Sequence, residues 1–286
     1  MRAFLSDGVT ASERREGPGI GSLTTAPEVS LRAVIEPWLG AGQTAHVVLC
    51  GMAGSRNGVV EVPYVELPTT ADRWLGATKS RRARDLELSV AAGLQGTNLL
   101  GAPDVMRGEE TQIFGALRLE PSLAIGRQLF VLPGTHSKWV EVSDGAITRF
   151  QTVLTGELYA LLRDHSTLLR ARASGGAPEG GFAAGVARSQ AATPGLQAAL
   201  FEARSAQLIL GRSRDWALEF LSGLLIGREA GQMSAAFGAV AAVTLIGDSR
   251  LRPLYRRVLS GRGVRTRELD GDECAIRGLL TVAQCA

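Results

Sequence analysis

The chain has 286 residues, of which 45% are hydrophobic and 21% are charged, and its 31 basic and 28 acidic residues give a net charge of +3. This length allows one large domain or two ordinary ones. The composition excludes a disordered, collagen-like or coiled-coil chain. The basic residues are scattered, apart from three arginines between positions 81 and 84 that lie beside Asp85 and Glu87. Since a nucleic-acid footprint needs a basic stripe or a recognisable module, we expect no nucleic-acid partner.

The cysteines and the apolar stretches indicate a cytoplasmic protein. Cys50, Cys274 and Cys285 are odd in number and widely spaced, which argues against a disulfide framework or a cysteine-based zinc site. The longest nearly uncharged apolar stretch, Ala235 to Gly247, is too short to span a bilayer. Asp7 interrupts the opening apolar residues, so no signal peptide is indicated. We therefore expect no membrane partner.

In the first half of the chain, the pattern predicts a hairpin, a helix and a strand that ends in a glycine loop. Asp7-Gly8 between extended runs at 2–5 and 9–15 is typical of a tight turn. Residues 27–39 carry apolar side chains at helical spacing behind a proline. A strand at 46–50 runs into Gly51-Met-Ala-Gly-Ser55, and α/β proteins often bind ligands at such a loop. Between Val65 and Glu109 the pattern predicts nothing definite.

The second half alternates strands and helices in mixed order. The predicted strands lie at 128–132, 139–142, 146–154 and 243–246, with a loop at 133–138 between the first two. The predicted helices lie at 109–119, 155–163, 216–230 and in the stretch that ends at 259, and a last strand and helix fall within 263–280. Residues 175–181 are interpreted as a linker. These elements predict an α/β fold with a partly antiparallel sheet.

The sharpest local motif is Val131-Leu-Pro-Gly-Thr-His-Ser-Lys-Trp-Val140. Such a turn between two strands offers successive backbone N–H groups, two hydroxyls and the ammonium group of Lys138, a combination that suits phosphate oxygens. Lysine occurs only at positions 79 and 138, whereas arginine supplies the remaining positive charge. The alternative, a tight hairpin with a polar surface loop, stays open. The motif is not a Walker A loop, and no GxGxxG fingerprint occurs.

A second motif, Asp104-Val-Met-Arg-Gly-Glu-Glu-Thr-Gln112, places Arg107, Glu109 and Glu110 beside a glycine at a predicted helix start. The helix dipole alone favours carboxylates in a first turn, which is the structural alternative. The functional interpretation is a carboxylate general base beside a cation that holds an anionic substrate. The histidines do not indicate a metal site, and no GxSxG or HExxH motif indicates a hydrolase.

Four strings together resemble the 2-dehydro-3-deoxygalactonokinase family: Asp104 to Gln112, Leu132 to Val140, Thr152 to Leu158 and Phe220 to Gly227. Gly51 to Ser55 and Val62-Pro-Tyr64 fit the same pattern, and the order and spacing match across nearly the whole chain. The resemblance implies the sugar kinase/Hsp70/actin superfamily, with a two-lobed, actin-like (ribonuclease H-like) ATPase fold, mixed sheets and ATP in the cleft. It implies lobes at residues 1–118 and 119–286. The implied activity is ATP-dependent phosphorylation of the 6-hydroxyl of 2-dehydro-3-deoxy-D-galactonate in galactonate catabolism.

The resemblance also implies roles for single residues. Glu109 takes the place of the catalytic base with Glu110 as its nearest rival, and Arg107 is a candidate for binding the substrate carboxylate. The other implied substrate-binding residues are Ser55, Thr155 and Glu157. The implied nucleotide-binding residues are Gly134, Thr135, His136, Ser137, Lys138, Gly247, Asp248 and Ser249. ATP and Mg²⁺ are the implied cofactors, no metal ligand is assigned, and a homodimer stays open.

The opening of the chain departs from the family pattern. The family normally has a strand and an Asp-Trp-Gly-Thr-Thr/Ser-Asn loop ahead of the Leu-Arg-Ala that Arg2-Ala3 resemble. Ser-Asp-Gly recurs at Ser6 and Ser143, and Met1 falls opposite Lys138 when the two copies are aligned. We therefore expect that the first strand and phosphate loop of the N-terminal lobe are missing, so that this form is less stable and has little or no kinase activity, unless the true start lies upstream.

Two alternatives to this activity stay open on the sequence. One is a kinase for another 2-keto sugar acid. The other is a non-catalytic protein that binds the sugar acid or the nucleotide. Assays of ADP release with a panel of sugar acids would distinguish them.

Overall fold

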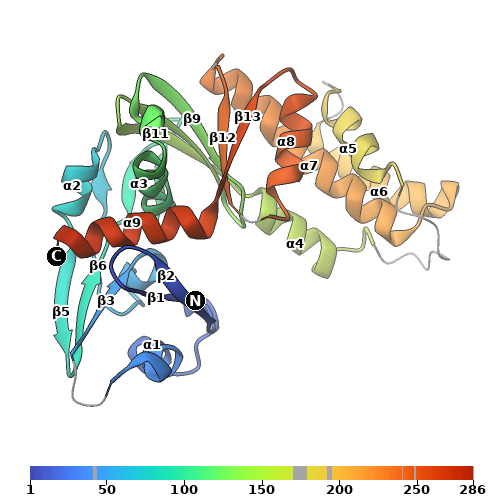
Figure 1. Cartoon of the computed structure of the whole chain (residues 1–286). Helices are drawn as coiled ribbons and strands as arrows, with labels where there is room; N and C mark the ends of the chain where they lie inside the picture. Colours follow the sequence, from blue (N-terminus) through green and yellow to red (C-terminus); the bar gives the residue numbers. More distant parts are fainter. Residues whose placement is uncertain (41–43, 170–178, 192–194, 240, 248, 286) are drawn as a thin grey trace. The chain divides into compact units, whose positions relative to one another are not determined.

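The computed structural model describes residues 1–40, 44–169, 179–191, 195–239, 241–247 and 249–285. Within these residues, helices alternate with strands that form sheets of two, three, three and five strands (Figure 1). Parallel and antiparallel pairs occur together, so the predicted α/β fold with mixed sheets is confirmed. The chain divides into two compact units, residues 1–130, 140–151 and 269–286 (unit 1) and residues 131–139 and 152–268 (unit 2). The lobe boundary at 118 and 119 stays a prediction.

Unit 1 opens with the predicted hairpin. Strand β1 (Arg2–Ser6) pairs antiparallel with β2 (Ala11–Glu16). The turn is held by the Asp7 carboxylate, whose Oδ1 accepts hydrogen bonds from the backbone N–H groups of Val9 and Thr10, each at 2.8 Å. Gly8 has a φ of +92°, a conformation that side-chain-bearing residues rarely adopt. The sequence motif therefore determines this hairpin locally.

The stretch between Val65 and Glu109, for which the sequence predicted nothing definite, forms most of two small sheets. In the first sheet, β3 (Ala45–Leu49) pairs parallel with β6 (Leu86–Val90), which pairs antiparallel with β5 (Lys79–Ala83). In the second sheet, the strands are β4 (Val65–Glu66), β7 (Leu94–Thr97) and β8 (Pro103–Met106). Other short elements of unit 1 are α1 (Pro27–Ile35), α2 (Ala71–Leu75) and the 3₁₀ turns η1 (Ile20–Ser22) and η2 (Glu36–Trp38).

Helix α3 (Glu109–Leu119) spans the predicted residues and packs against α9 (Gly271–Cys285). Two glycines permit this close contact, because a Cβ on Gly115 would clash with the backbone of α9 and a Cβ on Gly278 would clash with the backbone of α3. Gln112 adds a hydrogen bond of 2.9 Å from its side-chain amide to the carbonyl of Gly271. Helix α9 thereby fixes the orientation of α3, whose first turn carries Glu109 and Glu110.

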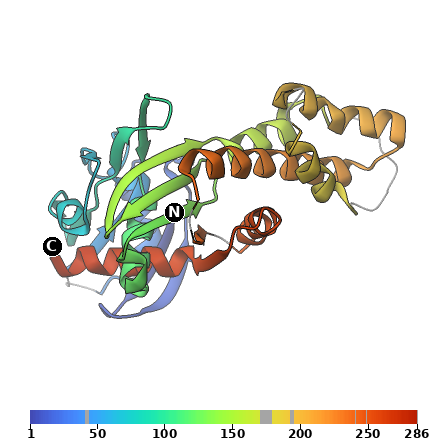
Figure 2. The ribbon, with the colours of Figure 1, turned by 90° about the horizontal axis from the view of Figure 1, so that it is seen from above.

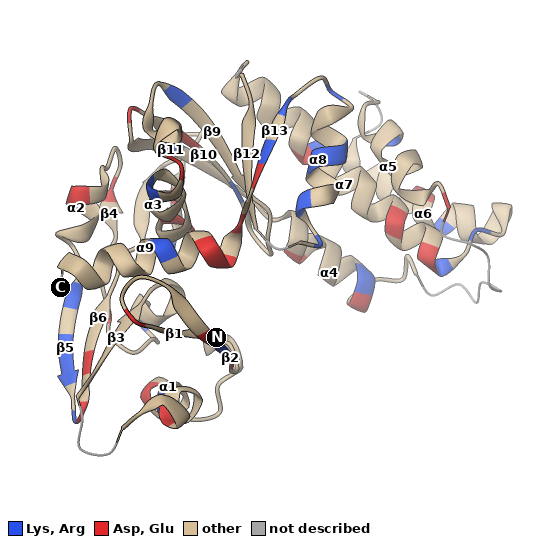
Figure 3. Cartoon of the chain, viewed as in Figure 1, with Lys and Arg blue, Asp and Glu red and all other residues tan. Residues whose placement is uncertain are grey.

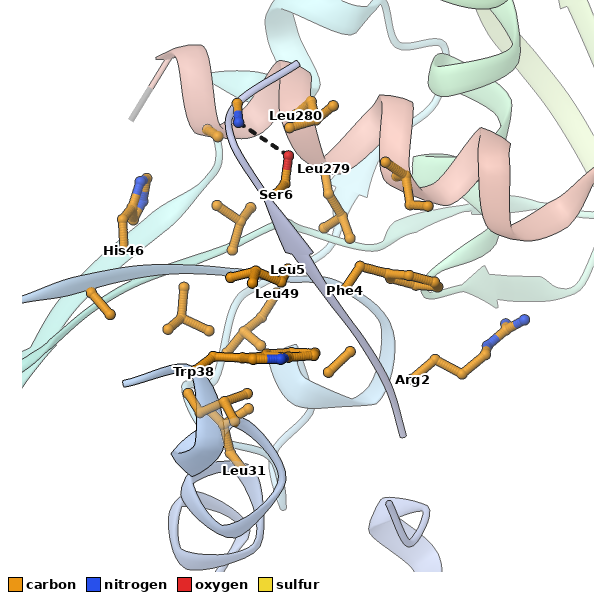
Figure 4. A pocket seen from close by; sticks show the side chains of 18 of the residues that line it. Arg2, Phe4, Leu5, Ser6, Leu31, Trp38, His46, Leu49, Leu279 and Leu280 are labelled. Carbon is orange, nitrogen blue, oxygen red and sulfur yellow. Dashed lines mark hydrogen bonds between the residues drawn. The ribbon is translucent and has the colours of Figure 1, made fainter. Parts of the chain in front are cut away.

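A groove of about 380 Å³ lies in unit 1 between β1, β3, α1 and α9. Its labelled lining side chains are mostly apolar, among them Phe4, Trp38, Leu49 and Leu279 (Figure 4). Every residue from Arg2 to Ser6 and from Ala45 to Leu49 lines the groove. Because successive side chains of a strand point to opposite faces, a wall of consecutive residues is a strand edge. The groove is therefore bounded by the edges of β1 and β3.

The largest sheet has the strand order β11-β10-β9-β12-β13. Its strands are β9 (Arg127–Leu132), β10 (Ser137–Ser143), β11 (Ala146–Val153), β12 (Val243–Gly247) and β13 (Thr266–Asp270). A 3₁₀ turn, η4 (Pro121–Ala124), precedes β9. Strand β10 begins at Ser137 instead of at Trp139, so the predicted loop at 133–138 is two residues too long. Ser137 and Lys138 belong to the strand because their side chains are buried, at 0% and 4% exposure.

In unit 2, glycines again allow helices to pack in close contact. Its helices are α4 (Thr155–His165), α5 (Gly181–Ser189), α6 (Leu196–Leu210), α7 (Arg214–Phe237) and α8 (Arg252–Ser260). A Cβ on Gly185 or Gly223 would clash with the backbone of the opposing helix, so α5 and α7 are in close contact. Figure 2 shows α7 beside α5 and α6 from above. The small residues that the sequence placed on one face of α7 thus mark this interface.

Two sequence predictions on unit 2 need correction or restriction. Helix α7 runs from 214 to 237, longer at both ends than the predicted 216–230. Helices α5 and α6 were not predicted. The predicted linker at 175–181 lies outside the described residues from 175 to 178, and Gly181 already begins α5.

Basic residues gather on β5, and one of them has an acidic partner on α1. Figure 3 shows Lys and Arg positions in blue along this strand. Arg81 forms an ion pair with Glu28, and the neighbouring Asp85 accepts two hydrogen bonds from Arg32, at 2.6 and 2.9 Å. Of the helices in the described residues, none combines the length and the apolar character that a membrane span requires.

Candidate active site

In unit 1, two glycines bring the loop after β3 against the N-terminus of α3. The loop forms the 3₁₀ turn η3 (Gly51–Gly54), and Gly51 and Gly108 have φ angles of +66° and +116°. A Cβ on Gly108 would stand 3.2 Å from the Cα of Gly51. Both positions require glycine, because the backbones approach closely and the φ angles are positive. The glycine loop that the sequence marked as a ligand site therefore lies beside the Arg107–Glu110 motif.

Arg107 is the cation of this site, and its guanidinium group is only partly satisfied. The group lies 4.0 Å from the centroid of the Tyr64 ring, and its Nη2 donates to the carbonyl of Val62 at 2.9 Å. The buried Nε and Nη1 atoms have no hydrogen-bond partner among the described residues. Gly54 makes room for the group, because a Cβ there would stand 2.8 Å from Nη1. A buried donor without a partner costs about 1–3 kcal/mol, and a bound anion would supply one.

Glu110 is a buried residue of the helix start. Its side chain is fully buried, and both carboxyl oxygens accept from the backbone N–H of Gly108, at 2.9 and 2.7 Å. The Thr111 hydroxyl donates to Oε1 at 3.0 Å. Burial, and then the neighbouring Glu109 carboxylate, raise the pKa of Glu110 to about 8. At neutral pH this carboxyl therefore holds its proton.

Glu109, in contrast, is partly exposed. Its Oε2 accepts a hydrogen bond of 3.1 Å from the backbone N–H of Arg107. A general base must be ionised and must reach the proton that it abstracts. Of the two carboxyl groups in this turn, that of Glu109 is the accessible one.

Cys50 and Ser55 flank the glycine loop. Burial, followed by the neighbouring Glu110 carboxylate, raises the pKa of the Cys50 thiol to about 12, so this thiol is not a nucleophile at neutral pH. The Ser55 hydroxyl donates to the carbonyl of Met52 at 2.8 Å and is accordingly part of the turn. The structure thus places Ser55 on the same loop as Gly54, which contacts Arg107.

In unit 2, the turn between β9 and β10 carries the second motif. Thr135 and His136 are exposed there. His136 Nε2 lies 2.5 Å from a carboxylate oxygen of Glu157, and the Glu157 N–H donates to the carbonyl of Thr135 at 2.9 Å. Glu157 therefore holds the turn through both its side chain and its backbone.

Close packing also holds the start of α4 on this turn. A Cβ on Gly156 would stand 2.2 Å from the carbonyl oxygen of Gly134, so only glycine fits there. Thr155 and Glu157 lie on either side of Gly156 in the first turn of α4. These two residues, implied by the family resemblance to bind substrate, therefore lie beside the predicted phosphate loop.

Ser137 and Lys138 point away from the exposed part of this turn. The Ser137 hydroxyl lies 2.9 Å from the hydroxyl of Tyr255, and Lys138 Nζ donates to the Thr152 hydroxyl at 2.9 Å. The family resemblance also assigned the late turn at 247–249 to the nucleotide. In that turn, Gly247 ends β12 close to Pro133, and Ser249 is exposed. Asp248 lies outside the described residues.

The sequence analysis did not single out three residues that are now functional candidates. Tyr64 contacts Arg107 through its ring, and its only sequence signal was its place in the Val62-Pro-Tyr64 string. Glu229 and Tyr255 lie behind the β9–β10 turn, and nothing in their local sequence indicates this. Among the described residues, no group of three or more His, Cys, Asp or Glu side chains could hold a metal ion.

Comparisons with known proteins agree with one another. The family model for 2-keto-3-deoxy-galactonokinase matches residues 1–282. The chain is 35% identical over 284 residues to the "Probable 2-dehydro-3-deoxygalactonokinase DgoK1" of Rhizobium meliloti (strain 1021), covering 97% of this chain and 90% of that protein. It is 31% identical over 285 residues to the 2-dehydro-3-deoxygalactonokinase of Escherichia coli (strain K12), covering 99% and 94%.

A solved structure shows the same relationship in three dimensions. The crystal structure titled as that of "a putative 2-dehydro-3-deoxygalactonokinase protein from Sinorhizobium meliloti" has a TM-score of 0.85 and 33% identity, and covers 99% of this chain and 94% of that one. The α/β fold, the two motifs and these matches define a carbohydrate kinase. The chain belongs to the 2-keto-3-deoxy-galactonokinase family.

Proposed function

We propose that this chain transfers the γ-phosphoryl group of ATP to the 6-hydroxyl of 2-dehydro-3-deoxy-D-galactonate, a step of galactonate breakdown. The names of the relatives support this substrate. One observation carries the proposal: Arg107 and Glu109 lie two residues apart at the start of α3. Arg107 has two buried donors that lack partners among the described residues, and Glu109 is a partly exposed carboxylate. The two-lobed, actin-like ATPase fold belongs to the same proposal and is supported by membership of the family.

Arg107 binds the carboxylate of the sugar acid in this proposal. A carboxylate would accept hydrogen bonds from the Nε and Nη1 donors and neutralise the guanidinium charge. Tyr64 and Val62 hold the guanidinium group from its other sides, so the cation is positioned before the substrate arrives. Preorganised charge of this kind lowers the cost of orienting a substrate.

Glu109 accepts the proton of the reacting hydroxyl. The sugar oxygen attacks the γ-phosphorus, the bond between that phosphorus and the bridging oxygen of ADP breaks, and the hydroxyl proton passes to a carboxylate oxygen of Glu109. Phosphoryl transfer depends mostly on positioning and charge stabilisation, and one group has to accept the hydroxyl proton. Glu110, which holds its own proton near neutral pH, keeps the Gly108 turn in shape.

The turn at 134–136, together with the start of β10 at Ser137 and Lys138, binds the nucleotide phosphates in this proposal. Thr135 and His136 are exposed there, and the buried Lys138 lies directly behind them in β10. Backbone N–H groups in such a turn bind anions well. Mg²⁺ usually keeps several waters and binds substrate phosphates with one or two carboxylates, and it would neutralise phosphate charge here.

The test is a coupled assay of ADP release with ATP and 2-dehydro-3-deoxy-D-galactonate, with ³¹P NMR of the product to locate the phosphate. The epimeric 2-dehydro-3-deoxy-D-gluconate is the matched control substrate. For the turnover that this form supports, we expect a 6-phosphate product from the galactonate derivative and a lower kcat/KM for the epimer. A higher kcat/KM for another 2-keto sugar acid would overturn the substrate assignment, and a phosphate on another hydroxyl would overturn the assignment of the 6-hydroxyl.

A further inference from the structure

A single buried carboxylate lies behind the β9–β10 turn in the part of the chain that the structure describes. Glu229, on α7, is 2% exposed, and its two oxygens accept different donors. Trp139 Nε1 donates to Oε1 at 2.7 Å, and the Tyr255 hydroxyl donates to Oε2 at 2.7 Å. The Tyr255 hydroxyl in turn lies 2.9 Å from the hydroxyl of Ser137. Burial raises the pKa of Glu229, while these donors lower it.

These groups come from two elements besides α7. Ser137 and Trp139 belong to β10, and Tyr255 belongs to α8. All three side chains are buried, at 2% exposure or less. Glu229 therefore connects β10 and α8 to α7 through side-chain hydrogen bonds, directly to Trp139 and Tyr255 and through Tyr255 to Ser137.

One of these groups directly adjoins the turn in the sequence. Ser137 follows His136, and its hydroxyl contacts that of Tyr255. The turn at 134–136 is also supported by the start of α4, where the backbone of Gly134 and Thr135 packs on Gly156 and the N–H of residue 157 donates to the carbonyl of Thr135. Of the two segments that support the turn, Glu229 therefore holds β10.

We propose that Glu229 is a positioning residue, which fixes the Gly134–Lys138 turn in the geometry that binds nucleotide phosphates; this proposal rests on the proposed function of that turn. A hydrophobic side chain could fill the same volume, but it could not accept the indole N–H of Trp139, which can only donate. Glu229→Gln replaces one of the two oxygens by an NH2 donor, so one buried donor loses its acceptor, and its rearrangement would displace Ser137.

The experiment compares Glu229→Gln with wild type in two measurements. Isothermal titration calorimetry measures the affinity for Mg·ADP, and steady-state kinetics measure KM for ATP and for the sugar acid separately. Loss of a buried hydrogen bond that leaves its donor unsatisfied corresponds to roughly a tenfold effect or more. We expect at least that loss in Mg·ADP affinity, a matching rise in KM for ATP and an unchanged KM for the sugar acid.

Two control variants make the result specific. Glu202→Gln removes a carboxylate of unit 2 that pairs with Arg188 on another helix, and we expect unchanged nucleotide affinity. Tyr255→Phe keeps the ring but removes the hydroxyl that contacts both Ser137 and Glu229, and we expect a smaller loss of Mg·ADP affinity in the same direction. If Glu229→Gln does not fold, Tyr255→Phe decides the question.

The outcomes separate this inference from the proposed function. Unchanged Mg·ADP affinity in a folded Glu229→Gln, or equal changes in both KM values, would overturn the positioning role. If Thr135→Val weakens Mg·ADP binding while both Glu229→Gln and Tyr255→Phe leave it unchanged, the turn binds the nucleotide and the inference alone is wrong. If wild type binds Mg·ADP but no turn variant alters the affinity, the nucleotide site itself is elsewhere.

Discussion

At the scale of single residues, the two adjacent glutamates of α3 have the same side chain and opposite environments. Glu110 is buried with three hydrogen bonds to its carboxyl group, and Glu109 is partly exposed. The sequence placed both in one helical turn and could not choose between them. We propose Glu109 as the base, because its carboxylate is accessible whereas the carboxyl group of Glu110 is buried.

The role of Glu109 leads to a kinetic prediction. Glu109→Gln removes the proton acceptor but keeps the shape of the side chain, so kcat should fall by about 10²–10⁴-fold, with the KM for the sugar acid little changed. Steady-state assays of ADP release measure this. Glu110→Gln is the matched control and should retain far more activity. A near-normal kcat with a raised KM would assign Glu109 to substrate binding instead.

The buried carboxyl of Glu110 makes stability depend on pH. Its pKa is about 8 in the folded chain, against an ordinary value of 4.5. Between these values the folded chain holds a proton that the unfolded chain releases, so the contribution of Glu110 to the free energy of unfolding falls as the pH rises. Glu110→Gln has no such proton. The difference in stability between the variant and wild type should therefore shift toward the variant as the pH rises through this window.

Urea denaturation at several pH values between about 5 and 8 measures this difference. Glu109→Gln serves as the control for the loss of a neighbouring carboxylate. Parallel pH profiles for wild type and Glu110→Gln would show that Glu110 ionises normally in the folded chain.

At the scale of elements, strands with clear alternation or turn chemistry were predictable, and those in the interval after Val65 were not. The hairpin around Asp7-Gly8 has its signal in the turn itself. The short strands β4, β7 and β8 have two to four residues each, too few for a periodic pattern. Their pairing depends on partners elsewhere in the chain, which is information that a local pattern does not contain.

The edge of β3 allows a direct test of the groove. Ala45 N–H donates to the carbonyl of Asp85, and Ala91 N–H donates to the carbonyl of Leu49. In a parallel pair, alternate residues direct their backbone groups to the same neighbour. The residues at 45, 47 and 49 therefore face β6, whereas the backbone groups of those at 46 and 48 face the groove.

Amide hydrogen exchange, followed by NMR, should show this alternation. We expect faster exchange at His46 and Val48 than at Val47 and Leu49, because only the latter amides are bonded to β6. All four amides lie on one strand, so a difference between the two pairs of amides does not reflect the overall stability of the strand. Equal protection of all four amides would mean that something covers this edge in solution.

At the scale of the whole molecule, the proposed binding residues for the two substrates belong to different compact units. Arg107 and Glu109 lie in unit 1, and the turn at 134–136 lies in unit 2. Each group is held by residues of its own unit, as Tyr64 holds Arg107 and Glu157 holds His136. Substitutions should therefore affect the two substrates separately.

Two variants test this separation. Arg107→Gln removes a charged donor set and should raise the KM for the sugar acid about 10–100-fold, with KM for ATP unchanged. Thr135→Val removes one exposed hydroxyl and should raise the KM for ATP about 3–10-fold, with KM for the sugar acid unchanged. Steady-state kinetics with each substrate varied in turn provide the measurement. Equal effects on both substrates from either variant would indicate a general folding defect instead.

The sequence by itself determined the features that depend on neighbouring residues: the Asp7-Gly8 turn, the start of α3 at Glu109, the α/β class and the strings that identify the family. Only the tertiary structure decided which glutamate is buried, that Arg107 keeps donors without partners among the described residues, and that Glu229 contacts Trp139, which is 90 positions away. The physical reason is that burial and hydrogen-bond partners are set by residues distant in the chain. A carboxylate has the same local pattern whether it ends in solvent or beneath a helix, and its pKa and its role follow from where it ends.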